Sequence, residues 1–145
     1  MHKNNRIFKY KEDILPFTII VSLFAFDVVV YSIINSLAFL LIRMVFSSAI
    51  KCIIVVWNHH HHHVNTFMSS VLNRFFENIL GLQTGISAFT WTLHHNFGHH
   101  INYLDQKKDQ SKWQHKNGNT MSAGSYTFIT TITCYWRAFK VGARE

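Results

Sequence analysis

An apolar stretch over residues 14–57 constrains the fold of this chain more than any other feature of its sequence. A helix needs about 20 apolar residues to cross the hydrocarbon core of a bilayer, so this stretch is long enough for two crossings. We expect a helical hairpin with its turn near residues 35–36. The alternative is one long helix that ends near Ile42, with Arg43 at the far interface and a short second element after it.

Three ionisable residues interrupt the apolar stretch: Asp27, Arg43 and Lys51. A charged side chain at the bilayer centre costs about 2.5 to 3.5 kcal/mol, so such residues pair, face the bundle interior or lie near an interface. A hairpin folded about a turn near residue 38 brings Asp27 level with about residue 49, close to Lys51, and we predict an ion pair between Asp27 and Lys51. The alternative is that Lys51 and Arg43 extend to the membrane surface.

Basic residues flank the apolar stretch on both sides and give the chain a net charge of +7. Such a charge suits nucleic acid or an anionic membrane surface. The apolar stretch favours the membrane, and the sequence contains no nucleic-acid motif. Because cytoplasmic flanks of membrane helices are enriched in Lys and Arg, we expect residues 1–13 and 58–145 on the cytosolic side.

Nine of the eleven histidines lie between residues 59 and 100, in two clusters. The first cluster is an unbroken run of five at residues 59–63, and the second contains four within residues 94–100. Neutral imidazole is the commonest transition-metal ligand among side chains. The first cluster alone would also fit a tag or a low-complexity metal-sequestering tract, but the second cluster repeats its four-residue step.

The spacing within the clusters predicts a metal site built on helices. Residues four apart share one face of a helix, so His59 pairs with His63, and His95 pairs with His99. His100 lies about 100° further round the helix than His99, which suits a ligand for a second, neighbouring metal.

The two clusters resemble the histidine boxes of the membrane fatty acid desaturase and hydroxylase superfamily. Residues 59–63 are similar to the first box, H-x(3–4)-H, and residues 95–100 are similar to the second, H-x(2–3)-H-H. Their separation is also similar to that in the family. The resemblance extends over residues 57–126, where the context at residues 73–74, 82–85 and 102–105 is similar to that of bacterial-type members.

This resemblance implies a non-haem di-iron centre that uses O2 to dehydrogenate or hydroxylate a fatty acyl chain. It also implies an electron donor such as a ferredoxin or a b-type cytochrome, and histidine boxes on the cytosolic membrane face. The positions that match the family's metal ligands are His59, His63, His95, His99 and His100.

Several neighbouring residues are candidates for a ligand in another register or for support of the ligands. The histidines among them are His60, His61, His62 and His94. Asp105 and Asp109 either orient imidazoles from outside or are merely solvated.

After His100 the chain departs from the family pattern. The family's third box follows a further membrane-spanning region, whereas the only later histidine here, His115, stands in a polar stretch. We therefore expect the front portion of a desaturase, inactive on its own. The alternatives are a non-catalytic, histidine-rich membrane protein that binds or transports metal, and a structural membrane peptide without a metal role.

Apolar periodicity predicts an amphipathic helix over residues 67–80, capped by residues 65–66 and stopped by Gly81. We expect it to lie in the membrane interface with its apolar face toward the lipid, or else against a soluble core. Residues 86–93 are too short to span and should run along the interface. Residues 126–136 begin a third spanning helix or form another interfacial segment.

Together these features predict an all-α membrane protein in three parts. Residues 1–13 form a cytosolic tail, and residues 14–57 form a transmembrane hairpin. Residues 58–145 form a partial desaturase domain of cytosolic and interfacial helices that carries the two histidine boxes.

Overall fold

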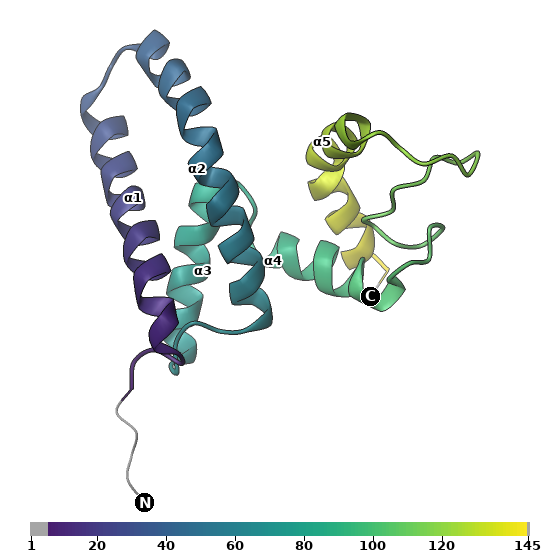
Figure 1. Cartoon of the computed structure of the whole chain (residues 1–145), viewed down its shortest axis with the longest axis horizontal. Coiled ribbons are helices and arrows are strands. Elements are labelled where there is room, and N and C mark those ends of the chain that lie inside the picture. Colours follow the sequence, from purple (N-terminus) through teal and green to yellow (C-terminus); the bar gives the residue numbers. More distant parts are fainter. Residues whose placement is uncertain (1–5, 145) are drawn as a thin grey trace, which may run out of the picture. The chain divides into compact units, whose positions relative to one another are not determined.

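The computed structural model describes residues 6–144, which form helices and connecting loops (Figure 1). No strand occurs among these residues, which confirms the predicted all-α class. The chain divides into two compact units between Ser87 and Ala88, and each unit is described by itself.

A helical hairpin forms most of the first unit (Figure 1). A 3-10 turn, η1 (Lys11–Asp13), leads into α1 (Ile14–Ile33), and a short loop leads into α2 (Leu37–His63). Both Lys11–Ile33 and Leu37–His63 are long and apolar enough to cross a membrane. The hairpin prediction is therefore confirmed, and the single-helix alternative is wrong. The second helix continues beyond residue 57, so the first histidine cluster is its last part.

An ion cluster joins the two helices of the hairpin. The buried carboxylate of Asp27 accepts hydrogen bonds from Arg43 Nη2, at 2.6 Å, and from Lys51 Nζ. The predicted ion pair is thus confirmed, and the alternative of cations extended to the surface is wrong. Because the helices turn at residues 34–36, Arg43 lies opposite Asp27 and joins the pair.

The third helix, α3 (Ser70–Thr84), packs beside α1 and α2 (Figure 1). Its start and end differ from the prediction. Ser69 is the N-cap, with its Oγ accepting from Leu72 N–H, and Gly85 ends the helix in a left-handed conformation at φ 72°. Glycine adopts such a positive φ without a steric penalty, whereas Gly81 lies inside the helix.

Phe76 and Leu80 of α3 form a buried core with Ile20 of α1 and Ile54 of α2. Aromatic rings extend this core toward the first histidine cluster, where Phe17 contacts Phe76 at a centroid distance of 5.3 Å. Such tilted ring pairs contribute about 0.5–1.5 kcal/mol beyond the area they bury. The core therefore fixes α3 against the helix that carries the first cluster.

The second unit contains α4 (Ala88–Trp91), a π-helix η2 (Thr92–Phe97), a 3-10 turn η3 (His100–Asn102) and α5 (Ala123–Gly142). The chain between η3 and α5 is a polar loop. Ser122 caps α5 by accepting from Ser125 N–H at 3.2 Å. Residues 126–136 lie within α5, which is not among the described helices that are apolar enough to span a membrane.

Candidate metal centre

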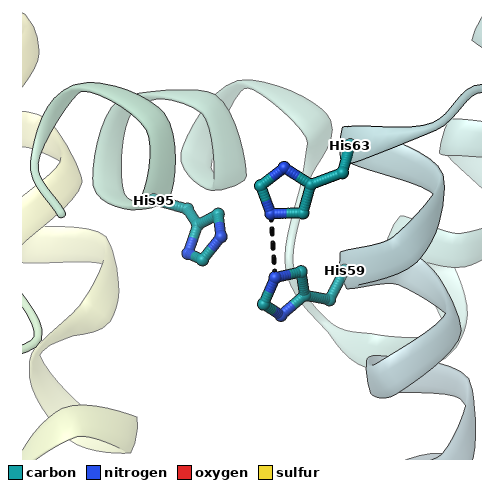
Figure 2. A group of neighbouring side chains, drawn as sticks. All are labelled: His59, His63 and His95. Carbon is teal, nitrogen blue, oxygen red and sulfur yellow. Dashed lines mark hydrogen bonds between the residues drawn. The ribbon is translucent and has the colours of Figure 1, made fainter. Parts of the chain in front are cut away.

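The first histidine pair lies on the last turns of α2. His59 and His63 lie on successive turns, and a hydrogen bond joins their Nε2 atoms (Figure 2). These atoms are 2.9 Å apart, and the ring centroids are 4.8 Å apart. Both side chains are exposed. The four-residue step therefore brings these two imidazoles together, as the sequence predicts.

This separation fits two ligands of one metal ion. Imidazole nitrogens bind such ions at about 2.0–2.1 Å, so two that are bound at a right angle lie about 3 Å apart. The 2.9 Å between the Nε2 atoms of His59 and His63 matches that distance.

His61, in the middle of the same run, has a different environment. It is fully buried, and its Nδ1 accepts from Thr66 N–H at 3.3 Å and lies 2.8 Å from Thr66 Oγ1. Its Nε2 lies 3.9 Å from Glu77 Oε1 on α3. Since Nδ1 accepts a backbone hydrogen bond, the ring proton is on Nε2, and His61 anchors α2 to the following loop and helix. Of the two roles that the sequence leaves open for His61, a metal ligand or a support of the ligands, its contacts favour the second.

The loop that follows the first pair is held by Asn73 of α3. The Asn73 amide donates to the Phe67 carbonyl at 3.0 Å and accepts from Phe67 N–H at 2.9 Å. Both groups are buried. Sequence reasoning missed Thr66, Asn73 and Glu77 as supports of the site, because each contact depends on how α3 packs against α2.

The second cluster, in the other unit, does not have the predicted α-helical geometry. Residues Thr92–Phe97 form a π-helix, in which Gly98 N–H donates to the Leu93 carbonyl five residues earlier at 2.9 Å. Single π turns of this kind occur often at functional sites. His99 N–H donates to the His95 carbonyl, four residues earlier, at 3.2 Å, so these two histidines keep the one-turn step that the sequence predicts.

The π turn nevertheless brings three imidazoles together. The Nε2 atoms of His95 and His100 lie 3.0 Å apart, and the ring of His99 lies 5.4 Å from His95 and 5.3 Å from His100, between centroids. The ring of His100 thus lies beside those of both His95 and His99. The 3.0 Å separation again fits two ligands of one metal ion.

A buried carboxylate supports His99. Asp109 lies 2.8 and 3.0 Å from His99 Nδ1 through its two oxygens, and its Oδ1 also accepts from Ser111 N–H. Such a carboxylate fixes the ring orientation of a metal-ligating histidine and leaves Nε2 to face the metal. Of the two aspartates considered from the sequence, Asp109 therefore contacts a ligand candidate, whereas Asp105 lies beside Lys108 in the loop.

His94 adjoins this group but lies against α5. Burial, with the neighbouring Arg137 and His99, holds the pKa of His94 below its ordinary value of 6.5, so the imidazole is neutral at pH 7. Its Nε2 is buried and has no hydrogen-bond partner within residues 6–144. His94 therefore packs as a neutral ring beside the three converging imidazoles.

The donors in both units fit a transition metal. All five ligand candidates offer imidazole nitrogen, which suits iron as well as zinc, copper and nickel. In each unit, one pair of Nε2 atoms lies at the distance expected for two ligands of one metal ion. The His99 ring is also held by the Asp109 carboxylate. The residues present therefore fit the iron that the resemblance implies.

Comparison with known proteins identifies the family of the chain. The family model for fatty acid desaturases matches residues 34–144, which include α2 and both histidine clusters. No curated protein and no solved structure matches the chain. The family match covers most of the sequence. Two helices of the chain are long and apolar enough to cross a membrane. The chain is thus a membrane protein that belongs to the fatty acid desaturase family.

Proposed function

We propose that this chain serves the O2-dependent dehydrogenation or hydroxylation of a fatty acyl chain at a non-haem di-iron centre. One observation carries the proposal: His95, His99 and His100 converge, with buried Asp109 behind His99, in a member of this family. When bound, the di-iron centre supplies the reduction of O2 and the removal of hydrogen from an unactivated C–H bond.

The chain's own residues bind and orient. His59 and His63 present paired Nε2 atoms from the end of a rigid helix, and Asp109 holds the Nε2 of His99 toward the metal. The exposed surface of the hairpin is apolar along its length, which suits a substrate whose acyl chain is dissolved in the bilayer. The basic flanks favour histidine boxes on the cytosolic face, where a ferredoxin or a b-type cytochrome donates electrons.

Iron binding tests the assignment of the ligands. The full chain in lipid nanodiscs is loaded with Fe(II) without oxygen, and its iron content and Mössbauer spectrum are measured. We expect His95→Ala/His99→Ala/His100→Ala to lose most of the bound iron, and His115→Ala, a histidine outside both clusters, to retain it. Equal iron in both variants would contradict the assignment. Tight binding of zinc or copper with no uptake of iron would favour the metal-binding alternative.

Product analysis tests the reaction. Because five imidazoles are fewer than the family's ligand set, we expect the 145 residues alone to leave acyl chains unchanged with O2 and a reductase. Co-expression with a membrane segment that carries a third histidine box should yield new double bonds or hydroxyl groups, detected by mass spectrometry of the lipids. His99→Ala should abolish them. An iron-loaded, co-expressed protein that modifies no acyl chain would overturn the proposal.

A further inference from the structure

The helix α3 buries three polar side chains beside its core residues Phe76 and Leu80, and it exposes large apolar side chains on its other side. Asn73, Glu77 and Gln83 are only 4, 9 and 8% exposed, whereas Val71 and Leu82 are 75 and 74% exposed. A helix in contact with water would expose the first three and bury the other two. Apolar side chains outside and polar side chains inside are instead expected where lipid is the solvent.

The end of α3 reaches deep along the hairpin. Gln83 Nε2 donates to the Ile20 carbonyl of α1 at 2.9 Å, and Gln83 Oε1 accepts from Lys51 of α2 at 3.0 Å. Ile20 lies about 14 Å along its helix from Lys11, where the candidate span begins, and half of the hydrocarbon core is about 15 Å. Gln83 is therefore near the level of the bilayer mid-plane.

The start of α3 lies at the level of the first histidine cluster. His61, near the end of α2, contacts the ring of Phe76 at a centroid distance of 5.2 Å. Phe67, in the loop before α3, contacts Phe17 near the start of α1 at 5.2 Å. The helix thus runs antiparallel to α2, from the membrane surface toward the centre.

The exposed polar side chains of α3 also differ between its two ends. Arg74 and Asn78 are exposed, and both belong to its first two-thirds. After Asn78, Leu82 is the exposed side chain of the helix, and the hydroxyl of Thr84 donates to the Leu80 carbonyl at 2.8 Å. The exposed polar side chains of α3 therefore lie in the part of the helix nearer the first histidine cluster.

We propose that α3 is a re-entrant helix that enters the bilayer beside the hairpin, ends near the mid-plane and contacts phospholipid acyl chains through Val71, Phe75 and Leu82. Lipid is the occupant of this face because the face is continuous in depth with the exposed apolar surface of the two spanning helices. In this arrangement α3 runs along the hairpin, whereas the sequence predicts a helix that lies in the membrane interface. The inference rests on the hairpin crossing the membrane and not on the reaction.

Spin labels test the depth of this helix. Single cysteines replace Val71 or Leu82 in the full chain carrying Cys52→Ser and Cys134→Ser, and each is labelled in phosphatidylcholine–phosphatidylglycerol vesicles. The depth reference is a label on native Cys52, in a chain that carries Cys134→Ser alone. Cys52 is exposed, and it is next in sequence to Lys51, which donates a hydrogen bond to Gln83. Power-saturation electron paramagnetic resonance then compares accessibility to O2 with accessibility to a water-soluble nickel complex.

We expect the Leu82 label to match the depth of the Cys52 label and the Val71 label to be shallower by up to about 16 Å, the rise of eleven helical residues. Equal depths for Val71 and Leu82 would show a helix lying flat in the interface and overturn the proposal. Low accessibility to both reagents at both positions would mean that another protein segment or a second copy covers the face, which also overturns it. Because no metal or turnover is measured, failure of this test leaves the proposed function standing.

Discussion

His99 Nδ1 lies within hydrogen-bond distance of both oxygens of the buried Asp109 carboxylate, at 2.8 and 3.0 Å. An ionised carboxylate only accepts hydrogen bonds, so Nδ1 carries the proton and Nε2 presents its lone pair. This relationship fixes the tautomer that a metal ligand requires. It also makes the carboxylate testable separately from the histidines.

Asp109→Asn should weaken metal binding by about 10–100-fold, because an amide orients the imidazole less firmly and makes it less basic. Competition with a chromogenic chelator measures the affinity. Asp105→Asn, in the same loop but beside Lys108, is the matched control and should bind as the wild type does. Unchanged affinity in Asp109→Asn would mean that the carboxylate does not support the site.

Asp27→Asn should destabilise the folded hairpin by about 3–5 kcal/mol, because Arg43 and Lys51 lose the charge that compensates them away from water. Unfolding in mixed micelles with increasing sodium dodecyl sulfate measures the effect. Adding Arg43→Gln and Lys51→Gln to Asp27→Asn should recover part of the loss. If the single variant unfolds like the wild type, the ion cluster contributes no net stability.

Asn73→Ala should destabilise the first unit by about 2–4 kcal/mol, because a buried N–H and a buried carbonyl of Phe67 both lose their partner. Thermal unfolding in detergent, followed by circular dichroism, measures the change. The control is Asn78→Ala, an exposed position on the same helix, which should stay within about 0.5 kcal/mol of the wild type. Equal effects of the two substitutions would contradict the role of Asn73.

Gly98→Ala should disturb the second cluster, because a Cβ atom there would lie 2.5 Å from Gln110 Cγ and 2.6 Å from the His94 carbonyl oxygen. The side chain of Gln110 can move, but the backbone carbonyl cannot, so we expect a loss of about 1–3 kcal/mol. Metal affinity should fall with it. Gly124→Ala, whose Cβ would have no neighbour within 4 Å, should change neither quantity appreciably. An undisturbed Gly98→Ala protein would show that the loop can shift away.

The hairpin and the Asp27–Lys51 pair were predictable because both are requirements of a lipid environment. Lipid requires long apolar helices, and it requires that a charge inside them find a partner. Arg43 was not assigned to the pair, since its position depends on where the chain turns. A turn a few residues earlier than the one assumed in pairing Asp27 with Lys51 moves Arg43 directly opposite Asp27.

The histidine positions could be predicted, but their surroundings could not. A four-residue step brings His59 and His63 together because α2 stays α-helical through them. The π turn before His99 leaves no signature in residue types, since it results from packing of the whole unit. The packing of α3 along both helices of the hairpin was likewise hidden, because periodicity marks an apolar stripe without saying which surface it packs against.

The π-helix sets a condition on the length of the second cluster. A π turn holds one residue more than the α turn it replaces, so deletion of a single residue between Thr92 and Phe97 would restore an ordinary α-helix. Deletion of Asn96, which lies between His95 and His99, would reduce their step from four residues to three and change the angle between them by about 100°. A transplant of these histidines into another scaffold must therefore carry the extra residue, since His95 and His100, five residues apart, would point about 140° away from each other on a regular helix.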